Sequence, residues 1–515
     1  VVDNFTLIMI LIAGVIGSLI AVFSLGYMEA FQKEHRDVRD RRNFFFFVLF
    51  LFLSAMFGLV VSNNLLYMYT FWEITSVCSF LLIGYTESRV AVNNSFKALW
   101  MNLLGGAAFA AAIIVMGLTY HSTALSHLVG LALAGMPVTV ILALLLLCGF
   151  TKSAMMPFSG WLLGAMVAPT PTSALLHSST MVKAGVFLII KLCPALGNNH
   201  AGTMAMFVGG ITFFFASCAA ISQSDGKKVL AYSTISNLGL IVCCAGIGSY
   251  EAAWTAIMIV IFHAVAKSLL FLSVGTAEQQ LGSRDIERFD GLFNAMPHLC
   301  LCMVIGISGM FLAPFGMLIS KWAAMKAFID AGHPMLLLLL VFGSATTIFY
   351  WAKWLGKILS VMNGQERREQ GITKGEWFTL KTLSWMTIIV CILFPLISSY
   401  GVLPYLRITY GFTRDVIAQS NLIIMSLMVV LLVILPSRYG KGQPKRKVGA
   451  LLAGVNTGDD RNYRGAGDNI IPVELRNWYM EEWFGEKKMK LSGFALCMAC
   501  IFIQFAIILG GVYRG

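Results

Sequence analysis

The chain has 515 residues, of which 58% are hydrophobic and only 12% are charged. Soluble domains carry roughly 25% charged residues, so this composition excludes an ordinary soluble protein. The formal net charge of +12 does not indicate nucleic-acid binding, because membrane proteins gather Lys and Arg in their cytoplasmic loops. The eleven cysteines mostly lie inside apolar runs, where Cys behaves as a small hydrophobic residue.

Fourteen apolar segments are long enough to span a bilayer, which requires about 20 mostly apolar residues. In chain order they are 4–28, 43–62, 64–85, 96–120, 137–168, 172–194, 203–223, 227–247, 252–276, 293–330, 335–360, 377–402, 418–437 and 490–512. The two longest contain Pro157 and Pro314, and proline breaks or kinks a helix. The sequence therefore predicts an all-α polytopic membrane protein with about 14 transmembrane helices, two of them broken.

Basic residues alternate between the loops. Lys and Arg occur in loops 29–42, 224–228, 277–292, 361–376 and 438–489, and are absent from 121–136, 195–202, 248–251 and 331–334. Only loop 403–417, with Arg407 and Arg414, departs from the alternation. The positive-inside rule places the basic group in the cytoplasm and both ends of the chain outside.

Three regions follow from this pattern. Residues 1–437 form the predicted ion-translocating transmembrane domain, 438–489 a polar cytoplasmic or interfacial segment, and 490–512 a last transmembrane helix. Within the first region, the two broken helices run in opposite directions. They predict inverted repeats over roughly 43–194 and 203–360, with the helix breaks near the membrane midplane.

Glu73 and Lys152 are the first candidate ion-pathway residues. Each lies in an otherwise apolar span, where an unpaired charge costs about 2.5–3.5 kcal/mol or more. We expect them to pair, which would keep the proton on Lys152. If the pair opens, burial disfavours the charged lysine and a proton can leave. A permanent salt bridge between helices is the alternative interpretation.

The other candidates continue along the chain. Lys183 follows His177 by six residues, and a proton could pass from Lys152 towards Lys183 through water. His263 and Lys267 are spaced i and i+4 on one helical face, and histidine suits a proton relay. Snorkelling is the alternative for Lys183, and a helix-packing hydrogen bond is the alternative for His177.

Two further lysines complete the set. Lys321 follows Pro314 in the second broken helix. Lys227 begins a helix on the predicted cytoplasmic side, where the positive-inside rule alone would also explain it. No nucleotide-binding, zinc-binding or nucleophile motif is recognisable, so we expect a non-catalytic subunit that binds no cofactor or metal.

Four ordered segments resemble the antiporter-like subunits of respiratory complex I, of Mrp sodium/proton antiporters and of energy-converting membrane-bound hydrogenases. They are FWEITSVCSFLLIGY, FTKSAMMPFSGWLLGAMVAPTPTSALLHSSTMVKAGVFL, KKVLAYSTISNLGL and FHAVAKSLLFLSVG. The resemblance covers roughly residues 1–330. It implies a charged, water-filled axis along the membrane plane that joins two half-channels.

The resemblance also implies roles for individual residues. Glu73 and Lys152 match the family's Glu–Lys pair, and Lys183 matches its central lysine. Lys321 matches the terminal charged residue of the second broken helix. The remaining matches are connecting positions of the proton path: Lys227, His263 and Lys267.

Two features depart from the family pattern. Members usually have two or more helices before VDNFTLIMI, and the polar segment before the last helix is rich in glycine. A long continuous helix is not expected through those glycines, and an amphipathic surface segment at 472–489 is predicted instead.

These observations predict a proton- or sodium-translocating membrane subunit of a redox-driven complex resembling a hydrogenase or complex I. The alternatives are a subunit of an Mrp-type secondary antiporter, a membrane scaffold with a vestigial channel, and a subunit of an inorganic-carbon uptake complex. Expected partners are other hydrophobic membrane subunits, lipid and, indirectly, peripheral iron–sulfur subunits, but no nucleic acid. The expected location is the inner (cytoplasmic) membrane.

Overall fold

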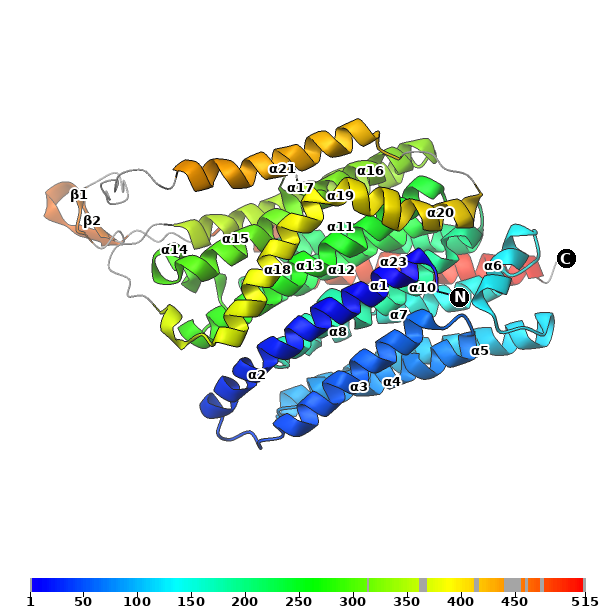
Figure 1. Cartoon of the computed structure of the whole chain (residues 1–515), viewed down its shortest axis with the longest axis horizontal. Coiled ribbons are helices and arrows are strands. Elements are labelled where there is room, and N and C mark those ends of the chain that lie inside the picture. Colours follow the sequence, from blue (N-terminus) through cyan, green and yellow to red (C-terminus); the bar gives the residue numbers. More distant parts are fainter. Residues whose placement is uncertain are drawn as a thin grey trace.

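The computed structural model describes residues 2–312, 315–360, 368–411, 416–439, 455–458, 462–472 and 477–512. These residues form a bundle of long helices with one small antiparallel sheet (Figure 1).

The helices up to the first break are mostly long. They are α1 (Asn4–Leu11), which continues through the π-helical turn Ile12–Ile16 into α2 (Gly17–Glu34), then α3 (Arg42–Val61), α4 (Leu65–Ile83), α5 (Arg89–Tyr120), α6 (Leu125–Leu133) and α7 (Thr139–Lys152). Beyond the break come α8 (Gly160–Gly164), the 3-10 turn Ala165–Val167, α9 (Thr170–Ala174), the π-helical turn η3 (Leu175–Ser179), α10 (Met181–Leu196), α11 (His200–Ile221), α12 (Gly226–Ile247) and α13 (Tyr250–Leu281).

The second part of the chain is more interrupted. Its helices are η4 (Ile286–Phe289), α14 (Leu292–Ala295), α15 (Pro297–Phe311), α16 (Gly316–Asp330), α17 (Pro334–Leu359), η5 (Glu369–Gly371), α18 (Lys374–Ile392), α19 (Phe394–Leu396), η6 (Ile397–Val402), α20 (Leu403–Tyr410) and α21 (Gln419–Tyr439). The strands β1 (Val455–Asn456), β2 (Asn462–Arg464) and β3 (Ile470–Pro472) form the sheet in that order, and a 3-10 turn (Ala466–Asp468) lies between the last two. The short α22 (Glu481–Phe484) precedes α23 (Glu486–Val512).

The predicted fold class is confirmed: the protein is a polytopic helical membrane protein. Eleven described helices are long and apolar enough to cross a membrane, and one bent helix pair meets the same test. Two shorter apolar helices, α7 and α21, coincide with the remaining predicted spans, 137–168 and 418–437.

The structure differs from the prediction in two places. The predicted span 377–402 bends by 65° between Lys374–Ile392 and Phe394–Tyr410, where Pro395 interrupts the hydrogen-bond ladder. The predicted loop 121–136 contains α6, a helix too short to span a membrane. The amphipathic surface segment at 472–489 stays a prediction: it contains α22 and the start of α23 at Glu486, and residues 473–476 lie outside the described residues.

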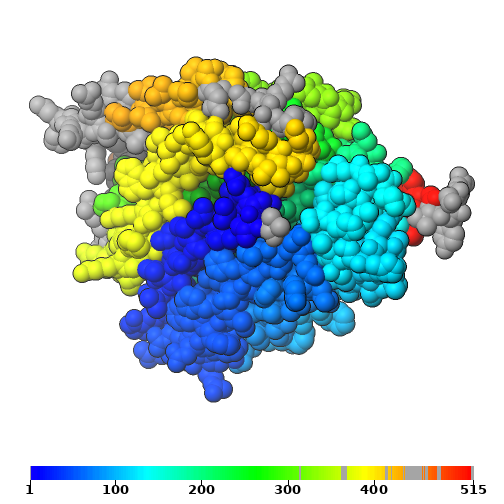
Figure 2. Space-filling model, turned by 45° about the vertical axis from the view of Figure 1, so that its right-hand side comes forward, coloured from blue at the N-terminus to red at the C-terminus, as the bar shows by residue number. Residues whose placement is uncertain are grey.

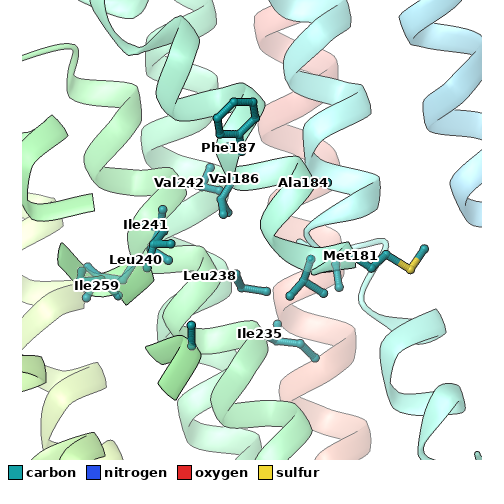
Figure 3. Packing of buried hydrophobic residues seen from close by; sticks show 14 of the residues in the cluster. Met181, Ala184, Val186, Phe187, Ile235, Leu238, Leu240, Ile241, Val242 and Ile259 are labelled. Atoms are coloured by element: carbon teal, nitrogen blue, oxygen red, sulfur yellow. The ribbon is translucent and has the colours of Figure 1, made fainter. Parts of the chain in front are cut away.

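In the core of the bundle, apolar side chains of α10, α12 and α13 meet (Figure 3). Glycines bring α11 and α12 into close backbone contact. A Cβ on Gly209 would lie 2.4 Å from the Cys243 nitrogen, and one on Gly239 would lie 2.7 Å from the Phe213 nitrogen. Small residues allow such close approach in membranes, where dispersion and packing drive helix association.

The loops sort to two ends of the bundle. The connection between α2 and α3 lies at one end with the sheet, whereas α6 and the N-terminus lie at the other (Figure 1). At the first end, Arg41 forms an ion pair with Glu87 at 2.6 Å. At the second end, the backbones of Asn64 and Ala124 form an isolated antiparallel β-bridge. This arrangement fits the alternation of basic loops; which end faces the cytoplasm stays a prediction. In the space-filling view, α1 and α2 fill the surface between α3 and the bent pair α18–α20 (Figure 2).

Candidate functional site

The break in the first long span places Lys152 at the last residue of α7. Residues 153–159 connect α7 to α8, and the break falls at Pro157, where the sequence predicts it. Two hydrogen bonds hold this segment: the Met156 amide donates to Thr212 Oγ1 at 3.1 Å, and Trp161 Nε1 donates to the Thr151 carbonyl at 2.8 Å. A helix C-terminus carries partial negative charge, which stabilises an ammonium at this position.

Lys152 is completely buried and binds α4. Its Nζ donates to the Trp72 carbonyl at 2.9 Å and to Ser76 Oγ at 2.7 Å, and lies 5.0 Å from the centroid of the Trp72 ring. These acceptors flank Glu73, so the two predicted partners lie on neighbouring helices within electrostatic range. The direct ion pair that the sequence suggested is not formed among the described residues, because Lys152 donates to the backbone and hydroxyl oxygens instead.

The Glu73 carboxylate faces α5. A Cβ on Gly106 would lie 2.2 Å from Glu73 Oε1, and one on Gly105 would lie 1.8 Å from Thr151 Oγ1. This pair of glycines therefore makes room both for the carboxylate and for the last turn of α7. Glu73 Oε1 is buried and has no hydrogen-bond partner among the described residues.

The second group lies between α10 and α13. Lys183 Nζ and His263 Nδ1 are 3.1 Å apart, and both side chains are completely buried. The α7 break touches the same helix α10, since a Cβ on Gly185 would lie 2.2 Å from Ser153 Oγ. The contact between Gly185 and Ser153 thus brings the Lys152 segment against the turn that carries Lys183.

His177 lies in the π-helical turn η3 and packs near two aromatic rings. Its ring centroid is 6.1 Å from that of Trp161 and 5.8 Å from that of Phe271. Neither ring nitrogen has a hydrogen-bond partner in the described part of the chain. The alternative interpretation of His177 is a hydrogen bond that fixes it in helix packing. The described residues form no such bond with it.

Lys267 lies one turn from His263 on α13 and binds α12. Its Nζ donates to the Leu230 carbonyl at 3.0 Å and to Ser233 Oγ, and lies 5.1 Å from the Trp351 ring centroid. The lysine is completely buried, and within the described residues no carboxylate neutralises it. Lys267 and Lys152 therefore share one mode of solvation, a backbone carbonyl and a serine hydroxyl on the next helix with an indole nearby.

Lys321 lies on α16, beyond the second break. Its ammonium is 5.7 Å from the Phe213 ring centroid, and its exposed fraction is 7%. Helix α15 ends at Phe311 and α16 begins at Gly316; Pro314 itself lies outside the described residues. Helix α16 packs on α13, so Lys321 extends the series of lysines by one helix.

Lys227 is held differently from the other lysines. Its Nζ forms an ion pair with Glu278 Oε2 at 2.7 Å, and Arg284 pairs with Asp225 at 2.7 Å beside it. This cluster lies at the ends of α12 and α13, next to the bridge between Asp225 and Asp285. The structure places Lys227 at the end of the bundle, apart from the lysines that are solvated by neutral oxygens.

Together these side chains form a row through neighbouring helices. From α4 the row passes through α7, α10 and α13 to α16; α4 contributes the partly buried Glu73, and each of the other helices contributes a buried lysine. Buried hydroxyls accompany it; Ser268 Oγ donates to Ser178 Oγ at 2.7 Å, and Ser217 and Ser236 lie 2.6 Å apart. Several buried polar atoms along the row have no partner among the described residues: Ser153 Oγ, Ser173 Oγ, Ser179 Oγ and His263 Nε2.

Lys191 and Lys357 are among the ionisable groups that the sequence did not single out. Lys191 binds Asp3 and lies 5.2–5.7 Å from the ring centroids of Phe5, Phe187 and Tyr405. Lys357 contacts Glu287 at 2.6 Å and Asp290 at 3.0 Å. Both lysines lie near the ends of apolar spans, a signal that resembles snorkelling, and their partners are far away in sequence. Within the described residues, no group of three or more His, Cys, Asp or Glu could hold a metal ion.

Comparisons with known proteins agree with this architecture. The family model "NADH:quinone oxidoreductase/Mrp antiporter, TM" matches residues 62–347, and "NADH-Ubiquinone oxidoreductase (complex I), chain 5 N-terminus" matches residues 1–45. The Na(+)/H(+) antiporter subunit A1 of Staphylococcus aureus strain JH9 is 33% identical over 394 residues, which cover 72% of this chain and 48% of that protein. The chain thus spans about half the length of the curated relatives it matches.

Solved structures share the fold. A chain of the Mrp complex from Dietzia sp. DQ12-45-1b superposes with a TM-score of 0.71 at 26% identity, covering 85% of this chain and 49% of that one. A chain of the archaeal membrane-bound sulfane sulfur reductase has a TM-score of 0.69 at 22% identity, covering 83% and 84%. The family model alone covers more than half of the sequence, and the chain belongs to the NADH:quinone oxidoreductase/Mrp antiporter family of membrane proteins.

Proposed function

We propose that the chain is an antiporter-like subunit that translocates protons, or exchanges them for sodium, within a multi-subunit membrane complex. The observation that carries the proposal is the row of buried lysines Lys152, Lys183, Lys267 and Lys321 on neighbouring helices. Intramembrane ionisable residues are costly and mark ion pathways.

The solvation of Lys152 and Lys267 suits proton transfer. Carbonyl and hydroxyl oxygens accept hydrogen bonds from an ammonium and add no formal negative charge, so they hold its proton less strongly than a carboxylate would. Lys183 and His263 are already within hydrogen-bond distance, and one proton can be shared between them. Longer gaps along the row would be bridged by water bound to the buried polar atoms that have no protein partner.

The Glu73–Lys152 pair is proposed as the switch of this row. In the described geometry the Lys152 ammonium is bound to Trp72 and Ser76, and Glu73 Oε1 lies against Gly106. A rotation of either side chain would bring the charges together, and their separation would release Lys152 for proton transfer. Movement of one charge against the membrane potential requires about 2.3 kcal/mol per 100 mV.

Two kinds of parent complex remain candidates. The sequence match to an antiporter subunit and the fold match to an Mrp complex support an Mrp-type sodium/proton antiporter. The second candidate is a redox-driven complex, supported by the complex I family match and by the fold match to a respiratory reductase. In either complex we propose that other hydrophobic membrane subunits adjoin this chain, that it binds no redox cofactor itself, and that it lies in the inner (cytoplasmic) membrane.

Purification of the native complex from its own membrane separates the two candidates. Co-purification with hydrophobic subunits alone, together with sodium-dependent proton movement in everted vesicles, would support the antiporter. Co-purification with iron–sulfur subunits, and ion uptake that requires an electron donor, would support the redox complex. Vesicles that hold the assembled complex and move no ion under either condition would contradict ion translocation.

A further inference from the structure

Helix α21 leaves cavities between itself and the bundle. It packs against α18 and α19, and three cavities of about 420, 440 and 360 Å³ lie along its length. Exposed side chains line all three, so each is open to the surface of the bundle and none is an enclosed packing void. The helix lies along one edge of the bundle (Figures 1 and 2).

The 420 Å³ cavity lies between α15, α18 and α21 and has a polar and an apolar end. His298 and Lys381 lie towards the starts of α15 and α18, whereas Val304, Ile388 and Leu432 line the rest. Leu301 and Trp385 are 58% and 59% exposed, so the mouth opens on the lateral surface of the bundle. The volume is within the range of about 300–1,000 Å³ that is typical of ligand sites.

Lys381 places a positive charge at the polar end of this cavity. It lies on a membrane-spanning helix, about 10 Å along the axis from the first residue of α18. Its side chain is exposed, and its described contact is the Trp377 ring, whose centroid is 5.6 Å from Nζ. The described residues supply no carboxylate to this lysine, whereas His298 beside it pairs with Glu369 at 2.8 Å. An exposed ammonium at this depth needs an anion or water.

We propose that this cavity is a binding site for an anionic phospholipid. The phosphate lies on the Lys381 ammonium at the level of Trp377, and one acyl chain fills the apolar cavity beneath α21. Tryptophan prefers this headgroup level, and lysine near a membrane interface attracts anionic lipid. The bound acyl chain would fill the space between α21 and the bundle. The lipid would thereby attach α21 to the rest of the domain.

The test is lipid retention by the purified full-length chain in its native complex, measured by native mass spectrometry. After delipidation, the protein is titrated with phosphatidylglycerol and with phosphatidylcholine of the same acyl chains. Lys381→Gln should bind phosphatidylglycerol about fivefold more weakly and phosphatidylcholine unchanged. Lys381→Arg, which keeps the charge, and Lys374→Gln, on the same helix but outside the cavity, should bind as the unmodified protein does.

Ser308→Phe provides a second arm, because a phenyl ring at the inner end of the cavity excludes the acyl chain. This variant should retain less of both lipids. Equal retention of the two lipids by the unmodified protein would show an unspecific lipid annulus and overturn the proposal. Undiminished phosphatidylglycerol binding by Lys381→Gln, or by Ser308→Phe should the first variant fail to assemble, would overturn it as well.

Discussion

At the scale of single residues, the site is organised by what surrounds each charge. Lys152 and Lys267 are each bound by one backbone carbonyl and one serine hydroxyl, although they lie on different helices. Lys227, in contrast, is neutralised by Glu278. Lys152 and Lys267 are therefore held by neutral oxygens, whereas Lys227, at the end of the bundle, is held by a carboxylate.

The first residue-scale prediction concerns Gly106→Ala. The added Cβ would lie 2.2 Å from Glu73 Oε1, so the carboxylate must move away from its place beside α5. Overpacking typically costs 1–3 kcal/mol, and we expect ion transport per assembled complex to fall by roughly tenfold. Transport is measured in vesicles after quantification of the complex.

Glu73→Asp in the Gly106→Ala background is the companion variant. Its shorter side chain relieves the contact, so part of the lost transport should return. Unchanged transport in Gly106→Ala alone would show that the position of Glu73 beside α5 is unimportant.

At the scale of elements, the α7 break depends on its contact with α10. A Cβ on Gly185 would lie 2.6 Å from the Gly149 carbonyl and 2.9 Å from the Ser153 amide nitrogen. Backbone cannot yield as a flexible side chain does, so Gly185→Ala should destabilise the protein by about 2–3 kcal/mol. Thermal unfolding in detergent should show a lower midpoint.

Gly117→Ala is the matched control, because Gly117 is also helical and has nothing within 4 Å of an added Cβ. Alanine is the better helix former, so this variant should be neutral or slightly more stable. An equal loss of stability in the two variants would contradict the close contact between the α7 break and α10.

The elements were largely predictable from the sequence, whereas their interruptions were less so. A run of about 20 apolar residues crosses the bilayer as a helix, and this rule located eleven described helices long enough to span it. The predicted span 377–402 is a bent pair, and 137–168 and 418–437 match the shorter helices α7 and α21. The bend after Ile392 and the short α6 depend on neighbouring helices, so hydropathy does not reveal them.

The candidate site was predictable as a set of residues but not as a geometry. Buried lysines are conspicuous in apolar runs, and the structure places Lys152, Lys183, Lys267 and Lys321 in one row. The acceptors Trp72, Ser76, Leu230 and Ser233 were not predictable, because a backbone carbonyl or a serine carries no signal in sequence. The roles of the site residues, and the inverted repeats, stay predictions.

At the scale of the whole molecule, the polar segment before α23 is tied to the bundle by a cluster around Glu287. The Tyr479 hydroxyl donates to Glu287 Oε1 at 2.5 Å, and the Asn477 backbone amide donates to the same oxygen at 3.2 Å. Lys357 contacts the other carboxylate oxygen, Oε2, at 2.6 Å. Tyr232 also donates to Glu486 at 2.8 Å. Residues 477–486 therefore connect the start of the last helix to the loop between α13 and α15.

This cluster predicts a pH dependence. Burial alone would raise the pKa of Glu287, but the hydrogen bonds from Lys357, Tyr479 and Asn477 outweigh it and hold the pKa below its ordinary value of 4.5. Because the pKa of Glu287 is lowered, the attachment of residues 477–486 to the bundle is fully stabilised above pH 4.5. It weakens as the pH falls through the lower pKa of the folded state. Hydrogen exchange of residues 477–486, corrected for the intrinsic rate, should therefore increase below pH 4.5.

Glu287→Gln should raise the same exchange already at neutral pH, because the charge-assisted bonds are lost. Glu482→Gln, in an exposed position of the same segment, should leave it unchanged. Slow exchange of 477–486 in Glu287→Gln at neutral pH would show that this cluster does not hold the segment.

The central claim is that the buried charges around Lys152 carry the ion. The most direct test is ion uptake in vesicles, normalised to assembled complex, for Lys152→Met and Glu73→Gln. Methionine fills a similar volume and removes a buried charge, so Lys152→Met should assemble and abolish transport. Glu73→Gln should impair transport as well, because Lys152 loses the partner that holds its proton. Poor assembly with normal transport per complex in Lys152→Met, or normal transport in both variants, would contradict the account.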